Sequence, residues 1–293
     1  LASAEINSLV SAIRAEVQAA SHSKIDKLGT GFQPQVPGEL TEDVLQWFRN
    51  KRFGSPEKPP KVLGEGGMGI AVLVWDQALR IYVVVKLIKT RDNKILERVQ
   101  GEAAAMANAG LETDAVVRVY HVETEGQPYI KMEYVPGPTE IMSESRAIPD
   151  ELRKEFCGKT VDGEGIMIAA KCLRNRLKEQ FPASLWIELQ EFIFFKAAET
   201  LDLIQQRCHI FHRDIKPANI LIMPEVADAL VRFINAGYLD PESAEGVLRK
   251  ELQRLKTLET PVKICDFGLV RSLSEQGGQE GPDSAMDLKR DHK

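Results

Sequence analysis

The sequence predicts an α+β protein built from two lobes, and two observations lead to that prediction. Residues 62–135 follow the order strand, strand, strand, helix, strand, strand, which is typical of a small antiparallel sheet carrying one helix. After Gly137 the pattern turns helical, with a long candidate at 184–207 and short apolar strands at 220–222 and 262–264. We therefore expect a small sheet lobe followed by a mainly helical lobe.

The composition is that of an ordinary globular chain and argues against several classes of protein. The 293 residues are 43% hydrophobic and 28% charged, enough for a substantial core. The net charge of −5 gives no sign of a nucleic-acid partner, and no unbroken apolar run is long enough to span a membrane. Four widely spaced cysteines without a CxxC pair indicate thiols in a reducing compartment. We expect a cytoplasmic protein.

Residues 1–57 are expected to form a helical flank of the small lobe. Apolar residues recur at helical spacing over 1–22, and 28–40 is rich in glycine and proline, as loops are. Thr41, followed by two acidic residues, is typical of the start of a short helix that continues through Phe48. The stretch "SPEKPP" at 55–60 marks the boundary with the small lobe, which we assign to 58–135.

A glycine pattern opens the small lobe. Gly64, Gly66 and Gly69 are spaced as G-x-G-x-x-G between two predicted strands, where backbone N–H groups can approach phosphate oxygens. A dinucleotide-binding turn shares this spacing but requires a helix directly after the last glycine. Here "IAVLVW" reads as a strand, which disfavours that alternative.

Lys86 lies inside the apolar strand 81–88, where a lysine is unusual without a partner. The two-residue alternation of a strand puts it on one face with Val84 and Ile88. Glu102, in the alanine-rich helix 94–109, is the candidate partner. A sheet-edge lysine that extends to solvent and a solvated glutamate remain the alternatives at this stage.

The stretch "HRDIKPAN" at 212–219 crowds two cations, a carboxylate and an amide between two apolar pairs. A solvated charged loop would explain it, and so would a loop held at both ends to place polar groups around a reacting phosphate. Further on, Asp266 of "DFG" follows the apolar strand 262–264, a position suited to a turn residue or to a Mg²⁺ ligand.

Together these residues resemble the eukaryotic-like Ser/Thr protein kinases, including bacterial members, over 62–271. The matching pieces occur in family order: "GEGGMG", "VVVK", a helix glutamate, "MEYV", "HRDIKPAN" and "DFG". The resemblance implies a bilobal kinase fold with a complete N-lobe, including the helix that the family calls αC, and an incomplete, mainly helical C-lobe over 136–293. It also implies transfer of a phosphoryl group from Mg-ATP to a Ser/Thr hydroxyl of a protein substrate.

The resemblance further implies a role for each matching residue. Asp214 would accept or orient the substrate hydroxyl proton, Lys216 would neutralise the γ-phosphate, and Asn219 and Asp266 would bind Mg²⁺. A lysine at position 216 is the Ser/Thr-type residue. ATP would be bound by the glycine loop, by Lys86 held in place by Glu102, by the gatekeeper Met132 and by hinge and cleft residues, which gives this set: Leu63, Gly64, Glu65, Gly66, Gly67, Met68, Gly69, Ala71, Val84, Lys86, Glu102, Met132, Glu133, Val135, Leu221 and Asp266.

Three departures from the family pattern qualify the resemblance. Ala71 and Val84 exchange the sizes that the family usually has there, which conserves the volume above adenine, and we expect that contact surface to be intact. Insertions fall at about 140–180 and at 223–260. The second is predicted to be a helical hairpin projecting from the catalytic face, either as a docking surface for a partner or as passive decoration.

The third departure concerns the end of the chain. Only 27 residues follow Asp266, without the Ala-Pro-Glu of the family, so we expect a fragment that ends in the activation segment. Arg213 before Asp214 indicates control by phosphorylation, with Ser272, Ser274 and Ser284 as candidates. Two other functions stay open: a nucleotide-binding pseudokinase that acts as a scaffold, and a small-molecule phosphotransferase.

Overall fold

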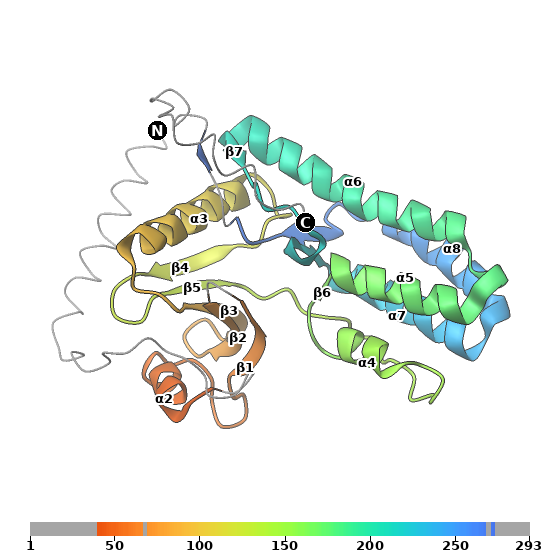
Figure 1. Cartoon of the computed structure of the whole chain (residues 1–293), viewed down its shortest axis with the longest axis horizontal. Coiled ribbons are helices and arrows are strands. Elements are labelled where there is room, and N and C mark those ends of the chain that lie inside the picture. Colours follow the sequence, from red (N-terminus) through yellow and green to blue (C-terminus); the bar gives the residue numbers. More distant parts are fainter. Residues whose placement is uncertain (1–39, 67–68, 268–270, 273–293) are drawn as a thin grey trace, which may run out of the picture.

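The structure is a computed structural model that describes residues 40–66, 69–267 and 271–272, and it has the two predicted lobes (Figure 1). The small lobe is a five-stranded antiparallel sheet in the order β1-β2-β3-β5-β4. Its strands are β1 (Lys61–Glu65), β2 (Gly69–Asp76), β3 (Ile81–Ile88), β4 (Val119–Glu123) and β5 (Tyr129–Glu133). The α+β prediction is confirmed.

One face of this sheet is covered by α2 (Glu42–Asn50), the short helix predicted after Thr41. Val72 and Val85 point to this face because they alternate with the half-buried positions of their strands. They pack against Phe48 of α2, which is fully buried.

The opposite face is covered by α3 (Asn93–Glu112), which the Asp92 carboxylate caps by accepting the backbone N–H groups of Lys94 and Ile95. Val99 and Ala103 of α3 pack against this face of the sheet. Between β2 and β3 the backbones approach so closely at Gly69 that a Cβ atom there would lie 2.2 Å from the Leu87 carbonyl oxygen. Only glycine fits at that position.

The large lobe is mainly helical, and its long helices lie roughly alongside one another (Figure 1). Most of its buried side chains form one core with the end of α3. Its helices are α4 (Asp150–Phe156), α5 (Gly163–Leu177), α6 (Ala183–Cys208), α7 (Pro224–Leu239) and α8 (Ala244–Leu255), with 3-10 turns η1 (Lys178–Gln180), η2 (Pro217–Asn219) and η3 (Pro241–Ser243). Its short strands form the sheets β6-β8-β9 and β10-β7, with bounds Val161–Asp162 (β6), Ile210–Phe211 (β7), Ile220–Ile222 (β8), Val262–Ile264 (β9) and Arg271–Ser272 (β10).

The prediction that 223–260 projects from the catalytic face as a hairpin is wrong. The segment does form two helices, α7 and α8, but α7 packs between α5 and α8, and α8 also packs on α6. Phe233 and Ile234 of α7 are fully buried, and Gly237 brings α7 so close to α5 that a Cβ atom there would lie 2.9 Å from Leu173. Because α7 is apolar around most of its circumference, it has to be covered on more than one side.

The polar face of α7 binds the segment that follows β5. Asp228 accepts the backbone N–H groups of Thr139 and Glu140 at 2.6 and 2.8 Å and the Thr139 hydroxyl at 2.8 Å. Arg232, one turn further, pairs with the Glu140 carboxylate at 2.6 Å. Asn235 binds the backbone of 141 and 143. We call these contacts the α7 clasp; they fix the chain just beyond the link between the lobes.

Some predictions concern residues outside the described part of the chain, namely the helix at 1–22, the loop at 28–39, and Ser274 and Ser284. Within the described residues, no helix combines the length and the apolar character needed to cross a bilayer. All four cysteines are unpaired thiols.

Candidate active site

Lys86 reaches from the sheet toward two carboxylates, one from each lobe. Its Nζ lies 3.5 Å from Oε1 of Glu102 in α3 and 2.5 Å from Oδ1 of Asp266, which follows β9. The Lys86 side chain is only 18% exposed, so the alternative of a sheet-edge lysine in solvent is excluded. Glu102 is 5% exposed and is therefore not a solvated helix residue either.

Burial and charge set the protonation of this cluster. Burial, together with a smaller effect of neighbouring Asp266, raises the pKa of Glu102 to about 7 against the opposing effect of Lys86. Burial acts in the same direction on Asp266, but Lys86 at 2.5 Å outweighs it and lowers the pKa of Asp266. The two carboxylates outweigh burial at Lys86 and raise its pKa. Lys86 and Asp266 are thus the firmly charged pair, and Glu102 is the group that titrates near neutrality.

The loop between β7 and β8 holds the second group of predicted residues. Lys216 Nζ lies 3.0 Å from Oδ2 of Asp214. Asn219 is buried, and its amide Nδ2 donates to the backbone oxygen of Asp214 at 2.8 Å and to Oδ2 at 3.2 Å. The hydrogen bond from Lys216 lowers the pKa of Asp214, so the carboxylate is ionised. The loop therefore holds an ordered polar cluster, which agrees with the explanation of "HRDIKPAN" as a fixed loop and not with a solvated charged loop.

His212 is a residue of this site to which the sequence reasoning gave no role. Burial lowers its pKa, so the ring is neutral. Its Nε2 lies 2.9 Å from the Cys265 carbonyl oxygen, and its Nδ1 accepts the Asp214 backbone N–H at 3.3 Å. The ring also packs against Phe267, with centroids 4.6 Å apart. His212 thus ties the loop that carries Asp214 to the segment that carries Asp266, and its place in the "HRD" triplet was the only sequence signal.

The two groups meet where β8 and β9 lie side by side. The Cys265 N–H donates to the Asn219 carbonyl oxygen at 3.0 Å, so Asn219 and Asp266 come from adjacent ends of neighbouring strands. Asp266 has a φ of +63°, a left-handed conformation uncommon for a residue other than glycine. Its carboxylate acts electrostatically on Asp214 as well as on Lys86. The side chains predicted at 86, 102, 214, 219 and 266 therefore converge on one region between the lobes.

The predicted adenine-contacting residues of the sheet share the face of Lys86. Ala71 lies opposite Lys86 across the β2–β3 ladder, and Val84 lies opposite Met132 across the β3–β5 ladder. Leu63 sits at a β-bulge of β1, next to Gly64. Leu221 is half-buried in β8 and packs on the large-lobe core. Gly67 and Met68 lie outside the described residues. Of the other glycine-loop residues, Gly64 and Glu65 end β1, Gly66 follows it, and Gly69 begins β2.

Glu133 and Val135, which the resemblance assigns to the ATP site, have partners that the sequence did not reveal. The Glu133 carboxylate accepts the Arg118 N–H at 3.1 Å and pairs at 2.9 Å with Lys263 of β9, whose side chain is 6% exposed. The Val135 carbonyl accepts the Thr160 hydroxyl. The link between the lobes is thus held from both the small and the large lobe.

Comparisons with known proteins fit this geometry. A model of the protein tyrosine and serine/threonine kinase family matches residues 59–288. A probable serine/threonine-protein kinase of Clostridium perfringens is 31% identical over 179 residues, which is 60% of this chain and 21% of that protein. Another of Streptomyces coelicolor is 25% identical over 237 residues, 78% of this chain and 24% of that protein. The chain spans about a fifth to a quarter of the length of these curated relatives.

Proposed function

The chain belongs to the protein tyrosine and serine/threonine kinase family, and from this we propose that it transfers the γ-phosphoryl group of Mg-ATP to a serine or threonine hydroxyl of a protein. The observation that carries the proposal is the convergence of Lys86, Glu102 and Asp266 with the ordered Asp214 loop. Phosphoryl transfer makes little covalent demand on the enzyme, so positioning and charge neutralisation account for most of the catalysis. The site offers charged groups suited to both.

Lys86 is the group that would bind the α- and β-phosphates. Its side chain is largely enclosed, and its ammonium is charged and held by carboxylates on two sides. If a triphosphate displaced Asp266 from Nζ, Glu102 would still hold the lysine from the α3 side. Val84 and Met132, adjacent across the ladder on the same face, would then contact the adenine ring.

The residues present fit a Mg²⁺ ion that is shared with the nucleotide. Asn219 and Asp266 would hold it, because Asn219 Nδ2 is engaged with Asp214 and its amide oxygen remains for a ligand, while Asp266 is ionised. Within the described residues no group of three or more His, Cys, Asp or Glu side chains is arranged around a metal position. Mg²⁺ bound through phosphates needs only one or two protein ligands. When bound, the ion would neutralise charge on the phosphates.

Asp214 is the residue we propose as the acceptor or orienter of the substrate hydroxyl proton. Its Oδ2 is positioned by Asn219, and Lys216 beside it can neutralise the transferring phosphate. Lysine at 216 and the names of the bacterial relatives favour Ser/Thr over Tyr as the acceptor. The unpaired cysteines favour a reducing compartment, and we propose the cytoplasm.

The test separates a kinase from a nucleotide-binding scaffold. We expect Mg-ATP to raise the melting temperature of the wild type and of Asp214→Asn, whereas Asp214→Asn should lower radiolabel transfer to a generic acceptor protein by about 10²–10⁴-fold. Lys86→Met should lose both signals, and exposed Asp202→Asn should keep both. Binding without transfer in the wild type would support the scaffold, and absence of the Mg-ATP shift in the wild type would refute the proposal.

A further inference from the structure

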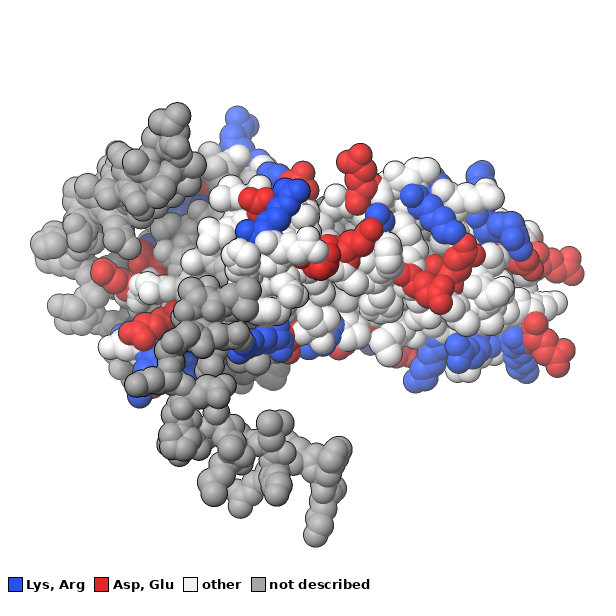
Figure 2. Space-filling model, turned by 90° about the horizontal axis from the view of Figure 1, so that it is seen from above, with Lys and Arg blue, Asp and Glu red and all other residues white. Residues whose placement is uncertain are grey.

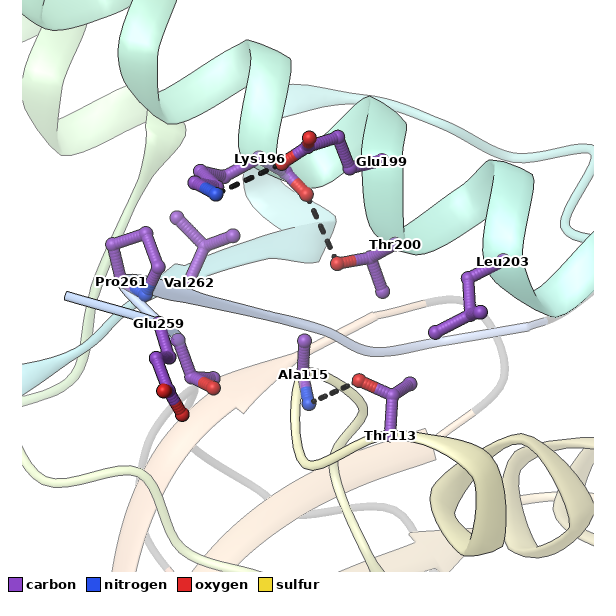
Figure 3. A pocket seen from close by; sticks show the side chains of 10 residues that line it. Thr113, Ala115, Lys196, Glu199, Thr200, Leu203, Glu259, Pro261 and Val262 are labelled. Atoms are coloured by element: carbon purple, nitrogen blue, oxygen red, sulfur yellow. Dashed lines mark hydrogen bonds and ion pairs between the residues drawn. The ribbon is translucent and has the colours of Figure 1, made fainter. Parts of the chain in front are cut away.

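Two hollows lie outside the candidate active site, and they differ in how their polar groups are occupied. The first, of about 140 Å³, lies between α6, the 113–115 turn and the approach to β9 (Figure 3). Lys196 pairs there with Glu199 at 2.9 Å, the Thr200 hydroxyl donates to the Lys196 carbonyl, and the Thr113 hydroxyl accepts the Ala115 N–H. Because its lysine and two of its three threonine hydroxyls have partners within the chain, this hollow is the weaker candidate for a ligand site.

The second hollow, which we call the α5–α6 groove, has a volume of about 300 Å³. It is lined by Met167, Ala170, Lys171, Arg174 and Asn175 of α5 and by Gln190 of α6. Among the described residues, no hydrogen bond or ion pair engages the side chains of Lys171, Asn175 or Gln190. The groove therefore presents a cation and two amides whose hydrogen-bonding capacity is not used within the described part of the chain.

Arg174 is the most strongly positioned of these groups. It lies one turn after Lys171, so both cations share a face of α5. Its guanidinium stacks on the ring of Phe181 at 5.7 Å, and Phe181 is buried. Among the described residues no carboxylate forms an ion pair with Lys171 or Arg174, although Glu179 follows Arg174 by only five positions. Arg174 lies in the last turn of α5, where the helix dipole favours a cation.

The groove also offers an apolar contact. The Met167 side chain is 53% exposed at one end of it, and Ala170 forms part of its wall. A methionine adapts its shape to different ligands, because its side chain is unbranched and its sulfur is polarizable. The surface therefore suits a ligand that combines carboxylates with at least one apolar side chain.

The position of the groove relates it to the loop that carries Asp214. Helix α5 begins at Gly163, where a Cβ atom would lie 2.8 Å from the carbonyl oxygen of Pro217, in the turn between Lys216 and Asn219. Lys171 and Arg174 lie about 12–17 Å further along the helix axis, at 1.5 Å per residue. An extended peptide covers that distance with about five residues.

We propose that the α5–α6 groove binds an acidic segment of the protein substrate, about five residues away from the serine or threonine that is phosphorylated. The proposal rests on the function proposed above and adds a substrate class to it. The carboxylates would pair with Lys171 and Arg174, the backbone would bind Asn175 and Gln190, and an apolar side chain would contact Met167. Two cations in a short groove suit a peptide, whereas a nucleic acid needs an extended basic surface, which a chain of net charge −5 does not favour.

Direct binding is the first test, with the full 293-residue chain and a fluorescein-labelled peptide of six glutamates and one leucine. We expect fluorescence anisotropy to show saturable binding, weakened about tenfold or more by Lys171→Glu with Arg174→Glu. The milder pair Lys171→Met with Arg174→Met, which keeps the apolar stems, guards against misfolding and should weaken binding in the same direction. Arg249→Glu with Lys250→Glu on α8 is the matched control and should leave binding unchanged.

The second test measures transfer to one acceptor protein with and without the glutamate segment five residues from its serine. We expect the segment to lower KM about tenfold in the wild type and in the α8 control, but not in the groove variants. The kcat on the acceptor without the segment should be the same in all variants. Lack of transfer to both acceptors, with binding intact, would refute the proposed function alone. Equal peptide binding by the groove variants, or tighter binding of a single-stranded oligonucleotide, would overturn the substrate proposal.

Discussion

Glu102 competes with Asp266 for one lysine, and this competition makes it sensitive to pH near neutrality. Asp266 is 1 Å closer to Lys86, and Glu102 is the more deeply buried of the two. The protonated form of Glu102 is therefore favoured up to about pH 7. A triphosphate that separates Asp266 from Lys86 would remove the competitor and favour the ionised Glu102.

The first prediction concerns stability as a function of pH. The pKa of Glu102 is raised in the folded state, from an ordinary value of 4.5 to about 7. Its stabilising contribution is therefore complete below about pH 4.5 and is lost as the pH rises through about 7. We expect the melting temperature of the wild type to fall between pH 5 and pH 7.5 relative to that of Glu102→Gln.

The control for this prediction is Glu97→Gln, which changes an exposed carboxylate of the same helix. Its melting curve should follow that of the wild type across the same pH range. Parallel curves for the wild type and Glu102→Gln would show that Glu102 titrates at the same pH folded and unfolded. A change of 1 kcal/mol in the free energy of unfolding shifts the melting temperature by about 2–4 °C for a chain of this size.

At the scale of single residues, the sequence predicted those side chains whose chemistry is read locally. Lys86 was conspicuous because it interrupts an apolar strand, and Asp214 because it stands in a charged cluster between apolar pairs. The partner of Glu133 was not predictable, because Lys263 is 130 positions away and is brought close only by the folded β9. His212 was missed because its role depends on where the Cys265 carbonyl lies.

Helix α7 shows what a pattern along one element can and cannot predict. Apolar spacing over 226–234 predicted the helix, and the structure confirms it. The same spacing did not say which neighbours would cover the helix, because periodicity reports the burial of a face and not its partner. Its place between α5 and α8 depends on the small Gly237 and on contacts far apart in sequence.

A core position for α7 gives a direct prediction. Phe233→Ala should lower the free energy of unfolding by about 3–5 kcal/mol, since the ring is fully buried and truncation leaves a cavity. Leu239→Ala on the same helix should change it by less than about 0.5 kcal/mol, since Leu239 is 57% exposed. Urea denaturation of both variants measures the difference. Equally small losses of unfolding free energy in both variants would contradict the packed position of α7 and support a hairpin that projects into solvent.

The α7 clasp gives a prediction about local order. Asp228→Ala removes the acceptor of three hydrogen bonds and should leave the Thr139 and Glu140 N–H groups without a protein partner. We expect faster hydrogen exchange in a peptide covering 137–144, measured by mass spectrometry. Asp202→Ala, which removes an exposed carboxylate from α6, should leave that peptide unchanged.

Across the whole molecule, the two lobes are joined by backbone and by charge. The Val117 N–H donates to the Ile264 carbonyl at 3.0 Å, and the Ile264 N–H donates to the Ala115 carbonyl at 2.8 Å. Beside them Lys263 pairs with Glu133, and both side chains are largely buried. Figure 2, in contrast, shows acidic and basic side chains side by side over much of one outer face of the molecule.

Breaking the Lys263 pair should therefore cost more than breaking a surface pair. Lys263→Met leaves the Glu133 carboxylate without its cation and should destabilise the chain by about 3 kcal/mol. The double change Lys263→Met with Glu133→Met should recover much of that loss. Lys256→Met, which breaks an exposed pair with Glu188, should cost less than about 1 kcal/mol. Equal melting temperatures for Lys263→Met and Lys256→Met would contradict the difference in burial.

The architecture as a whole was predictable because each lobe has a residue pattern typical of its secondary structure: strand-forming runs in the small lobe and helical spacing in the large lobe. The apolar, β-branched runs that became β2 and β3 and the long helical pattern that became α6 predicted a sheet lobe and a helical lobe within a few residues of their bounds. The assembly of the helical lobe was not predictable, because it depends on which of several apolar helices pair.

Asn219 directly precedes β8 and Asp266 follows β9, and these two strands are neighbours in space, yet 39 residues stand between them and fold into α7 and α8. Closing so long a loop costs chain entropy, which the packing of both helices has to repay before the two strands can stay paired. We therefore expect the pairing of β8 with β9 to form late in folding: a nascent or partly denatured chain would have its sheet lobe formed while Asn219 and Asp266 were still apart.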